Sequence, residues 1–210
     1  MIKRFTFLLL LFLTLSLHAQ ESGKWSISPA LIGGIFPSFP YNLKEYNPLL
    51  IPYIPIQYGN YYGEVRYNYD RNGTWGLYGG ISRTIGIQTI HVFTPQIGVV
   101  LGDYQGLSFQ FYYSLIHPKV EFNLTNNYVK VFNHHPNYYF NWSDIQFPIA
   151  TVWRAGFSTQ IFMDENVKTY DFGPMLAFRN KGWYAMLTYF NPWAQNKDYW
   201  FFALQKKIQF

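Results

Sequence analysis

The last twelve residues, YWFFALQKKIQF, alternate between two kinds of side chain. Counting back from Phe210, one set of alternate positions holds Ile208, Leu204, Phe202 and Trp200 around a single lysine. A period of two is the pattern of a strand with two different faces. One of these faces is a row of large apolar groups. We therefore expect this face to lie in hydrocarbon rather than in water.

The composition of the chain agrees with a hydrocarbon environment. Phe, Trp and Tyr make up 22% of the sequence and charged residues 13%, whereas soluble domains carry about 25% charged residues. After the first twenty residues there is no apolar run of the roughly 18 residues that a membrane-spanning helix needs. An aromatic-rich and charge-poor chain of this kind fits a barrel that crosses the membrane with strands.

Segment 1–20 has the pattern of a signal peptide. Two basic residues precede an apolar run from Phe5 to Leu17, which is too short to span a membrane as a helix. We expect cleavage after Ala19 or Gln20, which leaves 21–210 as one barrel domain. The chain has no cysteine, so disulfides and thiolate metal ligands are excluded.

The charge of the chain argues against nucleic acid as a partner. Without Lys3 and Arg4, 14 of the 16 basic residues remain against 11 acidic ones, and they are dispersed along the sequence. Binding to nucleic acid needs a concentrated basic patch. We therefore expect no nucleic-acid partner.

Alternation recurs in segments of about ten residues separated by turn residues, as a transmembrane barrel requires. The predicted strands are 25–35, 61–69, 74–83, 88–101, 106–115, 153–161, 170–178, 183–191 and the C-terminal strand. Short turns are predicted at 70–73, 102–105 and 179–182, and we expect all three on the periplasmic side. The predicted fold is all-β: a closed, antiparallel, up-and-down transmembrane barrel of ten strands, with eight as the alternative.

Two tracts determine the predicted strand count. Phe36 to Ile56 carries five of the 12 prolines, and because proline lacks a backbone N–H group we expect an external loop here. The alternative is a lid or plug over the barrel mouth, formed by Leu49, Leu50, Ile51 and Ile54. Residues 119–132 are predicted to form a hairpin above the membrane, with its turn at 125–127.

The inward face of the predicted strands carries the candidate site. On the alternation argument six polar residues project into the lumen: Glu64, Arg66, Arg154, Asp171, Gln205 and Lys207. A barrel of this size has a lumen filled largely by its own side chains. We therefore expect a polar network in which these charges neutralise one another, with a pore or a catalytic site as the alternatives.

The histidines do not form a recognisable metal or catalytic motif. His134 and His135 are adjacent, so on a strand they would point to opposite faces, and no carboxylate pattern accompanies them. Ser114 and His117 are three residues apart and would also face opposite ways. We predict no metal, no cofactor and no catalytic residue.

The closing strand resembles the C-terminal assembly signal of Gram-negative outer-membrane barrels. Terminal Phe210 and the apolar Ile208, Leu204 and Phe202 carry this resemblance, while Lys206 departs from the ideal apolar position. The resemblance implies recognition by the barrel-assembly machinery and insertion among outer-membrane lipid.

The expected function is a membrane scaffold or a surface-exposed receptor. Its external loops, mainly 36–57 and 117–144, would bind an extracellular ligand. One alternative is a lipid-modifying enzyme similar in architecture to outer-membrane lipid A deacylases and palmitoyl transferases, for which His91 is the residue to test. The other alternative is a narrow porin-like channel.

Overall fold

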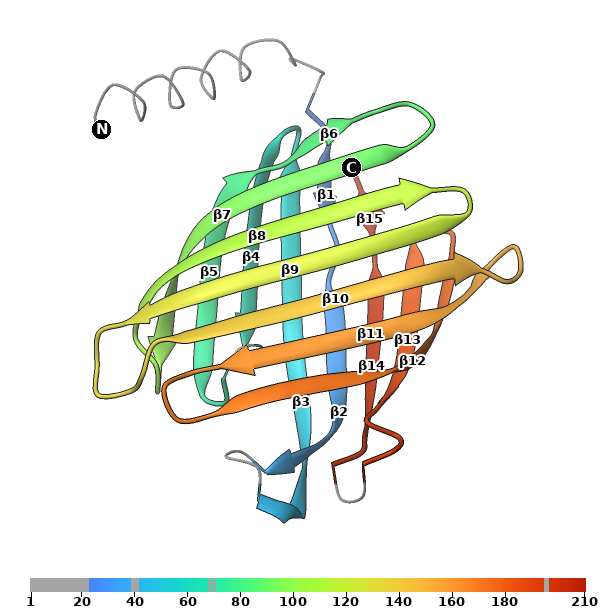
Figure 1. Ribbon diagram of the computed structural model, residues 1–210. Helices are drawn as coiled ribbons and strands as arrows, with labels where there is room; N and C mark the ends of the chain where they lie inside the picture. Colours follow the sequence, from blue (N-terminus) through green and yellow to red (C-terminus); the bar gives the residue numbers. More distant parts are fainter. Residues whose placement is uncertain (1–22, 39–41, 68, 70, 195–196) are drawn as a thin grey trace, which may run out of the picture.

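The computed structural model describes residues 23–38, 42–67, 69, 71–194 and 197–210. These residues form one continuous antiparallel sheet (Figure 1). The predicted signal peptide, 1–20, lies outside the described residues. Within the described part of the chain, no helix is long and apolar enough to cross a membrane.

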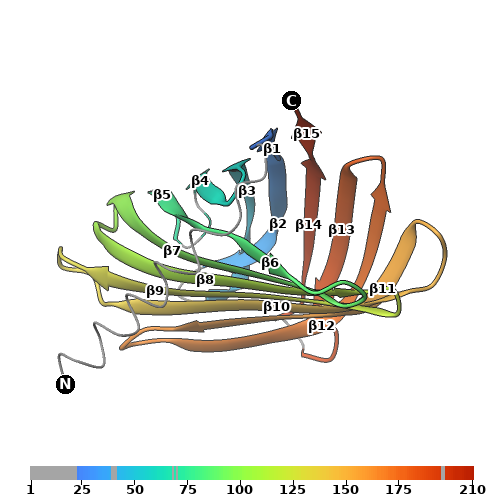
Figure 2. The same ribbon diagram turned by 90° about the horizontal axis from the view of Figure 1, so that it is seen from above.

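The described residues form a closed ring of twelve strands. They are β2 (Ala30–Ser38), β3 (Asn42–Tyr58), β4 (Tyr61–Tyr67), β5 (Thr74–Ile81), β7 (Ile90–Gly102), β8 (Gly106–His117), β9 (Val120–Val131), β10 (Tyr138–Pro148), β11 (Trp153–Met163), β12 (Lys168–Asn180), β13 (Trp183–Phe190) and β14 (Tyr199–Lys206). Consecutive members of this series pair with each other, and β14 pairs with β2 to close the ring. In Figure 2, β2–β5 with β13 and β14 lie along one side of the ring and β7–β12 along the other.

Three short strands, β1 (Trp25–Ile27), β6 (Arg83–Ile85) and β15 (Ile208–Gln209), continue strands of the ring. β1 extends β2 in the same register along β3, and β6 extends β5 along β7. β15 extends β14 and pairs with β1. All fifteen elements therefore belong to twelve strands around the barrel.

The all-β, closed, up-and-down order agrees with the prediction from the sequence, but the predicted number of strands is wrong. The ring has twelve strands, not ten or eight. Both tracts that were expected to lie outside the barrel contribute strands to its wall.

Most of the proline-rich tract belongs to strand β3 rather than to an external loop or a lid, while Pro37 lies in β2 and Pro40 falls outside the described residues. Pro55 lies opposite Ser28, whose N–H donates to the Pro55 carbonyl at 3.0 Å. Because proline has no N–H group, Pro55 cannot donate to the Ser28 carbonyl in turn. The side-chain Nε2 of Gln205 donates to this carbonyl instead, at 3.3 Å. The other prolines of β3 come before the first residue of β3 that pairs with β4. The N–H groups that they lack would therefore fall outside the hydrogen-bond ladder between β3 and β4.

The predicted turn at 125–127 is also wrong, because it lies in the middle of β9. Its asparagines bond to neighbouring strands instead of reversing the chain. Asn126 Oδ1 accepts a hydrogen bond from Asn141 Nδ2 on β10 at 2.9 Å, and Asn127 Oδ1 accepts one from the Ser108 hydroxyl on β8. The chain reverses at 118–119 and again at 132–137.

The turns lie at two ends of the barrel, which we call the C-terminal end and the distal end. At the C-terminal end, Lys207 N–H donates to the carbonyl of Gly182 at 2.8 Å. At the distal end, Asp103 N–H donates to the carbonyl of Gly73 at 3.2 Å. The prediction that 70–73 and 102–105 share the end of 179–182 is therefore wrong.

The two faces of the wall differ as alternation predicts. On β8, Phe109 is 55% exposed and its neighbour Gln110 only 3%. On β14, Phe202 is 42% exposed and its neighbour Phe201 only 1%. Large apolar side chains thus cover the outside of the barrel, where hydrocarbon would solvate them.

Candidate functional site in the barrel interior

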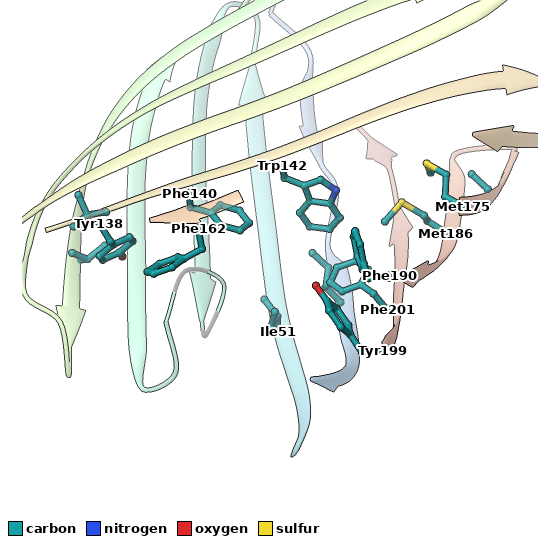
Figure 3. Packing of buried hydrophobic residues seen from close by; sticks show 14 of the residues in the cluster. Ile51, Tyr138, Phe140, Trp142, Phe162, Met175, Met186, Phe190, Tyr199 and Phe201 are labelled. Carbon is teal, nitrogen blue, oxygen red and sulfur yellow. The ribbon is translucent and has the colours of Figure 1, made fainter. Parts of the chain in front are cut away.

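One half of the interior is packed with apolar side chains, and we call it the apolar half (Figure 3). It lies mainly inside β10–β14 and includes Ile32, Ile51, Tyr138, Phe140, Trp142, Phe162, Met175, Met186, Phe190, Tyr199 and Phe201. The rings of Phe201 and Trp142 meet edge to face, with their centroids 4.7 Å apart. Buried polar side chains such as Gln146, Ser158, Asp171 and Thr188 lie among these apolar ones, and Val100, Val129 and Val131 extend the cluster onto β7 and β9.

The other half of the interior, inside β3–β5 and β7–β9, is polar, and Glu64 on β4 lies at its centre. The Glu64 carboxylate accepts hydrogen bonds from Arg66 (3.0 Å), Gln110 (2.9 Å), Tyr53 (3.0 Å), Tyr62 (3.0 Å) and Tyr112 (2.8 Å), a group that we call the Glu64 cluster. Gln110 and Tyr112 belong to β8, which is not a neighbour of β4 in the ring. The cluster therefore crosses the lumen.

Arg66 supplies the positive charge of this cluster. The side chain is 1% exposed, and its Nη2 donates to the Tyr78 hydroxyl at 2.7 Å. The guanidinium also lies over the rings of Tyr69 and Tyr78, 4.4 Å and 4.2 Å from their centroids. A buried ion pair is stable only when hydrogen bonds satisfy both partners, and aromatic residues provide many of those contacts here.

Arg154, a predicted lumen residue, lies apart from the Glu64 cluster. Its Nη2 pairs with Glu121 on β9 at 2.9 Å. Arg179 pairs with the same Glu121 oxygen at 3.0 Å. This second acidic centre, which the sequence reasoning missed, is bound by two arginines.

The remaining predicted lumen residues also lie in separate places. Asp171 is buried and accepts a hydrogen bond from Asn191 Nδ2 at 2.6 Å. Gln205 bonds to the backbone at the break between β1 and β2. Lys207 is exposed between β14 and β15 at the C-terminal end. The structure thus brings only Glu64 and Arg66 together among the six.

The residues of the predicted assembly signal lie along the closing strand. Phe202 and Leu204 point outward from β14, and Ile208 lies in β15. Phe210 is 77% exposed, and its N–H donates to the carbonyl of Trp25 at 3.0 Å. Their recognition by an assembly machinery stays a prediction.

Arg71, in the turn between β4 and β5, closes over the distal end of the lumen. Its Nη2 donates to Asp164 Oδ2 at 2.5 Å, and Asp164 begins the turn between β11 and β12 on another part of the ring. The guanidinium also lies over Phe162, 3.9 Å from the ring centroid. We call these contacts the Arg71 latch.

Burial lowers the pKa of the Arg71 guanidinium from its ordinary value, while the nearby Tyr104 and Asp164 side chains act to raise it. An arginine stays charged under such opposing influences. Tyr69, from the same turn, reaches into the lumen, with its ring 5.8 Å from Phe140 and 5.9 Å from Tyr53. The turn therefore obstructs the lumen with two side chains.

A cavity of about 1780 Å³ lies at the polar half, toward the C-terminal end, and is lined by outward-facing residues such as Ile97, Phe109 and Tyr128 as well as by inward ones. Its polar wall includes Gln57, Ser82, Gln96, Gln110 and Asn127, and the basic residues Lys24, Arg83 and Lys207 also line it. Ordinary small-molecule pockets measure about 300–1,000 Å³. Among its described lining residues none is acidic.

The histidines lie outside this arrangement. His91 is at the C-terminal end, where its Nδ1 lies 2.9 Å from the Tyr113 hydroxyl. His134 and His135 are in the turn before β10, with their ring centroids 4.1 Å apart. Across the described residues, no three His, Asp or Glu side chains are grouped so as to hold a metal ion.

The closed wall, apolar outside and divided inside, is the fold of an outer-membrane β-barrel, as the resemblance of the closing strand implied. A solved structure of KdgM porin is similar, with a TM-score of 0.53 and 10% identity over 85% of this chain and 98% of that chain. A second, titled KdgM porin in complex with disordered oligogalacturonate, has a TM-score of 0.51 and 10% identity over 88% and 99%. At this identity the likeness concerns the fold alone. No family model and no curated protein sequence matches the chain.

Proposed function

We propose that the chain is an integral outer-membrane protein of a Gram-negative bacterium and acts as a narrow, gated, porin-like channel for small polar solutes. The observation that carries this proposal is the cavity of about 1780 Å³ in the polar half, with the Arg71 latch across the distal end. The signal peptide, lipid as the surrounding medium and the assembly machinery as a biogenesis partner belong to the same proposal.

The number of strands supports this function. Eight-stranded barrels are filled by their own side chains, whereas barrels of 16 to 18 strands leave an aqueous channel. A ring of twelve strands lies between these sizes. In this ring the apolar half fills part of the lumen, and the cavity occupies part of the polar half.

The Arg71 latch supplies the closed state of the proposed channel. It connects the turn between β4 and β5 to Asp164 through the ion pair of Arg71. Because Tyr69 and Arg71 belong to the same turn, movement of that turn would withdraw both side chains from the lumen. Because the Glu64 cluster also crosses the lumen, opening the path would separate its hydrogen bonds between β4 and β8 as well.

Single-channel recording in planar bilayers tests the proposal. We expect rare, brief openings from the unaltered protein and a several-fold higher open probability from Arg71→Gln, which loses the ion pair. Lys119→Gln, which also removes one positive charge, is the matched control, because Lys119 lies in the turn between β8 and β9 at the C-terminal end and is not among the residues that line the cavity. Silence of both the unaltered protein and Arg71→Gln, with the barrel folded, would refute a channel.

A membrane scaffold or surface receptor is the second candidate. The Glu64 cluster and the apolar half cross or fill much of the lumen, which favours a barrel that does not conduct. The sequence placed the receptor's loops at 36–57 and 117–144, but these ranges are mostly strand. The candidate contacts are instead distal residues such as Phe132 and Trp193, 65% and 64% exposed.

The receptor is distinguished from the channel by ligand capture on whole cells. If the chain is a receptor, Trp193→Ala should reduce capture of an extracellular ligand, while Arg71→Gln should show no channel openings in planar bilayers. Unchanged capture by Trp193→Ala would count against a binding surface at this residue.

A further inference from the structure

Two glutamines face each other across neighbouring strands in the wall of the cavity. Gln96 on β7 pairs in register with Gln110 on β8. They are 4% and 3% exposed, and both line the cavity. Side chains directly opposite each other on an antiparallel pair lie close enough to act on one ligand.

Three atoms of these amides have no hydrogen-bond partner among the described residues. They are Nε2 and Oε1 of Gln96 and Oε1 of Gln110. Most buried side-chain polar atoms in proteins are hydrogen-bonded, so three exceptions at one place call for an explanation. The Nε2 of Gln110, in contrast, donates to Glu64 at 2.9 Å, which fixes the side chain.

The backbone makes room for Gln96 at this place. A Cβ atom on Gly80, the inward residue opposite on β5, would lie 2.7 Å from Cγ of Gln96 and 2.2 Å from the carbonyl oxygen of Pro95. Only glycine fits in such a space. The Gln96 side chain therefore lies against bare backbone.

The charged residues around Gln96 and Gln110 indicate which kind of ligand this place can bind. Glu64, the acid beside Gln110, is already bound to Arg66 at 3.0 Å. Of the basic lining residues the lysines are exposed, and the half-buried Arg83 pairs in register with Phe93, three residues along β7 from Gln96. A charged group buried beside two neutral amides would lose its hydration without gaining a counter-ion. The bound part of a ligand must therefore be uncharged.

An amide offers a donor and an acceptor, and its best partner is a group that does both, such as a hydroxyl. We propose that Gln96 and Gln110 form a binding site for an uncharged, hydroxyl-rich solute of the small neutral saccharide class. The cavity of about 1780 Å³ has room for several sugar rings. The inference gives the proposed channel a substrate class. The binding site itself does not depend on conduction, and only its role in transport rests on the proposed function.

Calorimetric titration of the folded, detergent-solubilised barrel tests the site, with maltotriose as the neutral probe and trigalacturonate as the acidic one. We expect maltotriose to bind, and Gln96→Leu to weaken this binding roughly tenfold, since about two net hydrogen bonds are lost. Gln96→Met, a second apolar replacement of similar length, should have the same effect and guards against misfolding of one variant.

Gln146→Leu is the matched control. Gln146 is also a buried, inward glutamine, but it lies on β10 and bonds to the Tyr184 hydroxyl at 3.1 Å. This variant should bind maltotriose as the unaltered protein does. Absence of maltotriose binding, equal weakening by Gln146→Leu, or tighter binding of trigalacturonate than of maltotriose would each overturn the proposal.

Binding and conduction are measured separately, so the two proposals fail separately. A protein that binds maltotriose but is silent in bilayers has the site without the channel. A protein that conducts without binding maltotriose has the channel without this site.

Discussion

The apolar and polar halves of the interior are built on the same wall but are stabilised in different ways. Phe201 and Arg66 are each 1% exposed. Both point inward from strands whose side chains alternate between the two faces of the wall. Phe201 contacts other rings, whereas Arg66 contacts a carboxylate and hydroxyls. Alternation therefore determines which residues enter the lumen, while the chemistry of those residues determines what the lumen does.

The apolar and polar halves are expected to contribute differently to the stability and to the function of the barrel. Apolar packing stabilises by contact and needs no partner of opposite charge. Buried polar groups stabilise little unless every one is paired. Neither amide atom of Gln96 in the polar half has a partner among the described residues, whereas Gln146 in the apolar half lacks one only for its Oε1. We therefore expect the apolar half to support the barrel and the polar half to accommodate solute.

The largest effect is expected from breaking the ion pair of the polar half. Arg66→Met leaves the Glu64 carboxylate buried without its cation and should lower the free energy of unfolding by about 3–5 kcal/mol. Adding Glu64→Gln removes the remaining charge and should restore part of this loss. Urea titration of the barrel in vesicles measures both, and an additive double variant would show that the two residues are not coupled.

Adjacent phenylalanines on β14 provide the next test. Phe201→Ala leaves a cavity in the apolar half and should cost about 3–5 kcal/mol. Phe202→Ala loses only the transfer of the ring from water to lipid, about 1.5–3 kcal/mol, because lipid fills the space. The same urea titration compares them. Equal losses would mean that the two faces of this strand do not differ as described.

The smallest effect is expected from the unpaired amide. Gln96→Leu removes polar atoms that have no partner among the described residues, so the free energy of unfolding should change by less than about 1 kcal/mol. Gln146→Leu, which loses the bond to Tyr184, should cost about 0.5–1.5 kcal/mol. A larger loss from Gln96→Leu would indicate that the Gln96 amide is structural.

Much of the wall could be predicted from the sequence, because the period of two is a local property. Strands such as β8 and β14 show it clearly in their own residues. β3 could not be recognised, since Gln205, distant in sequence, replaces the bond that Pro55 lacks. β9 was misread because its asparagines have the composition of a turn and reveal their partners only in the sheet.

The candidate site was harder to predict for the same reason. Glu64 and Arg66 were found because they share one strand face. Tyr53 lies in the proline-rich tract, and Tyr112 belongs to a strand that does not adjoin β4. The contact between Arg71 and Asp164 spans 93 positions of sequence. No local pattern indicates contacts of this range.

The central claim is that the interior is divided and that water enters only its polar half. The chain has no cysteine, so single cysteines can be introduced and labelled without background. We choose Gln96→Cys in the polar half, Ala177→Cys in the apolar half (Ala177 is 1% exposed) and Leu187→Cys on the outer face (Leu187 is 44% exposed and is not among the residues that line the cavity). In vesicles, a small water-soluble thiol reagent should label only the Gln96→Cys variant. Labelling of all three at similar rates would contradict the account.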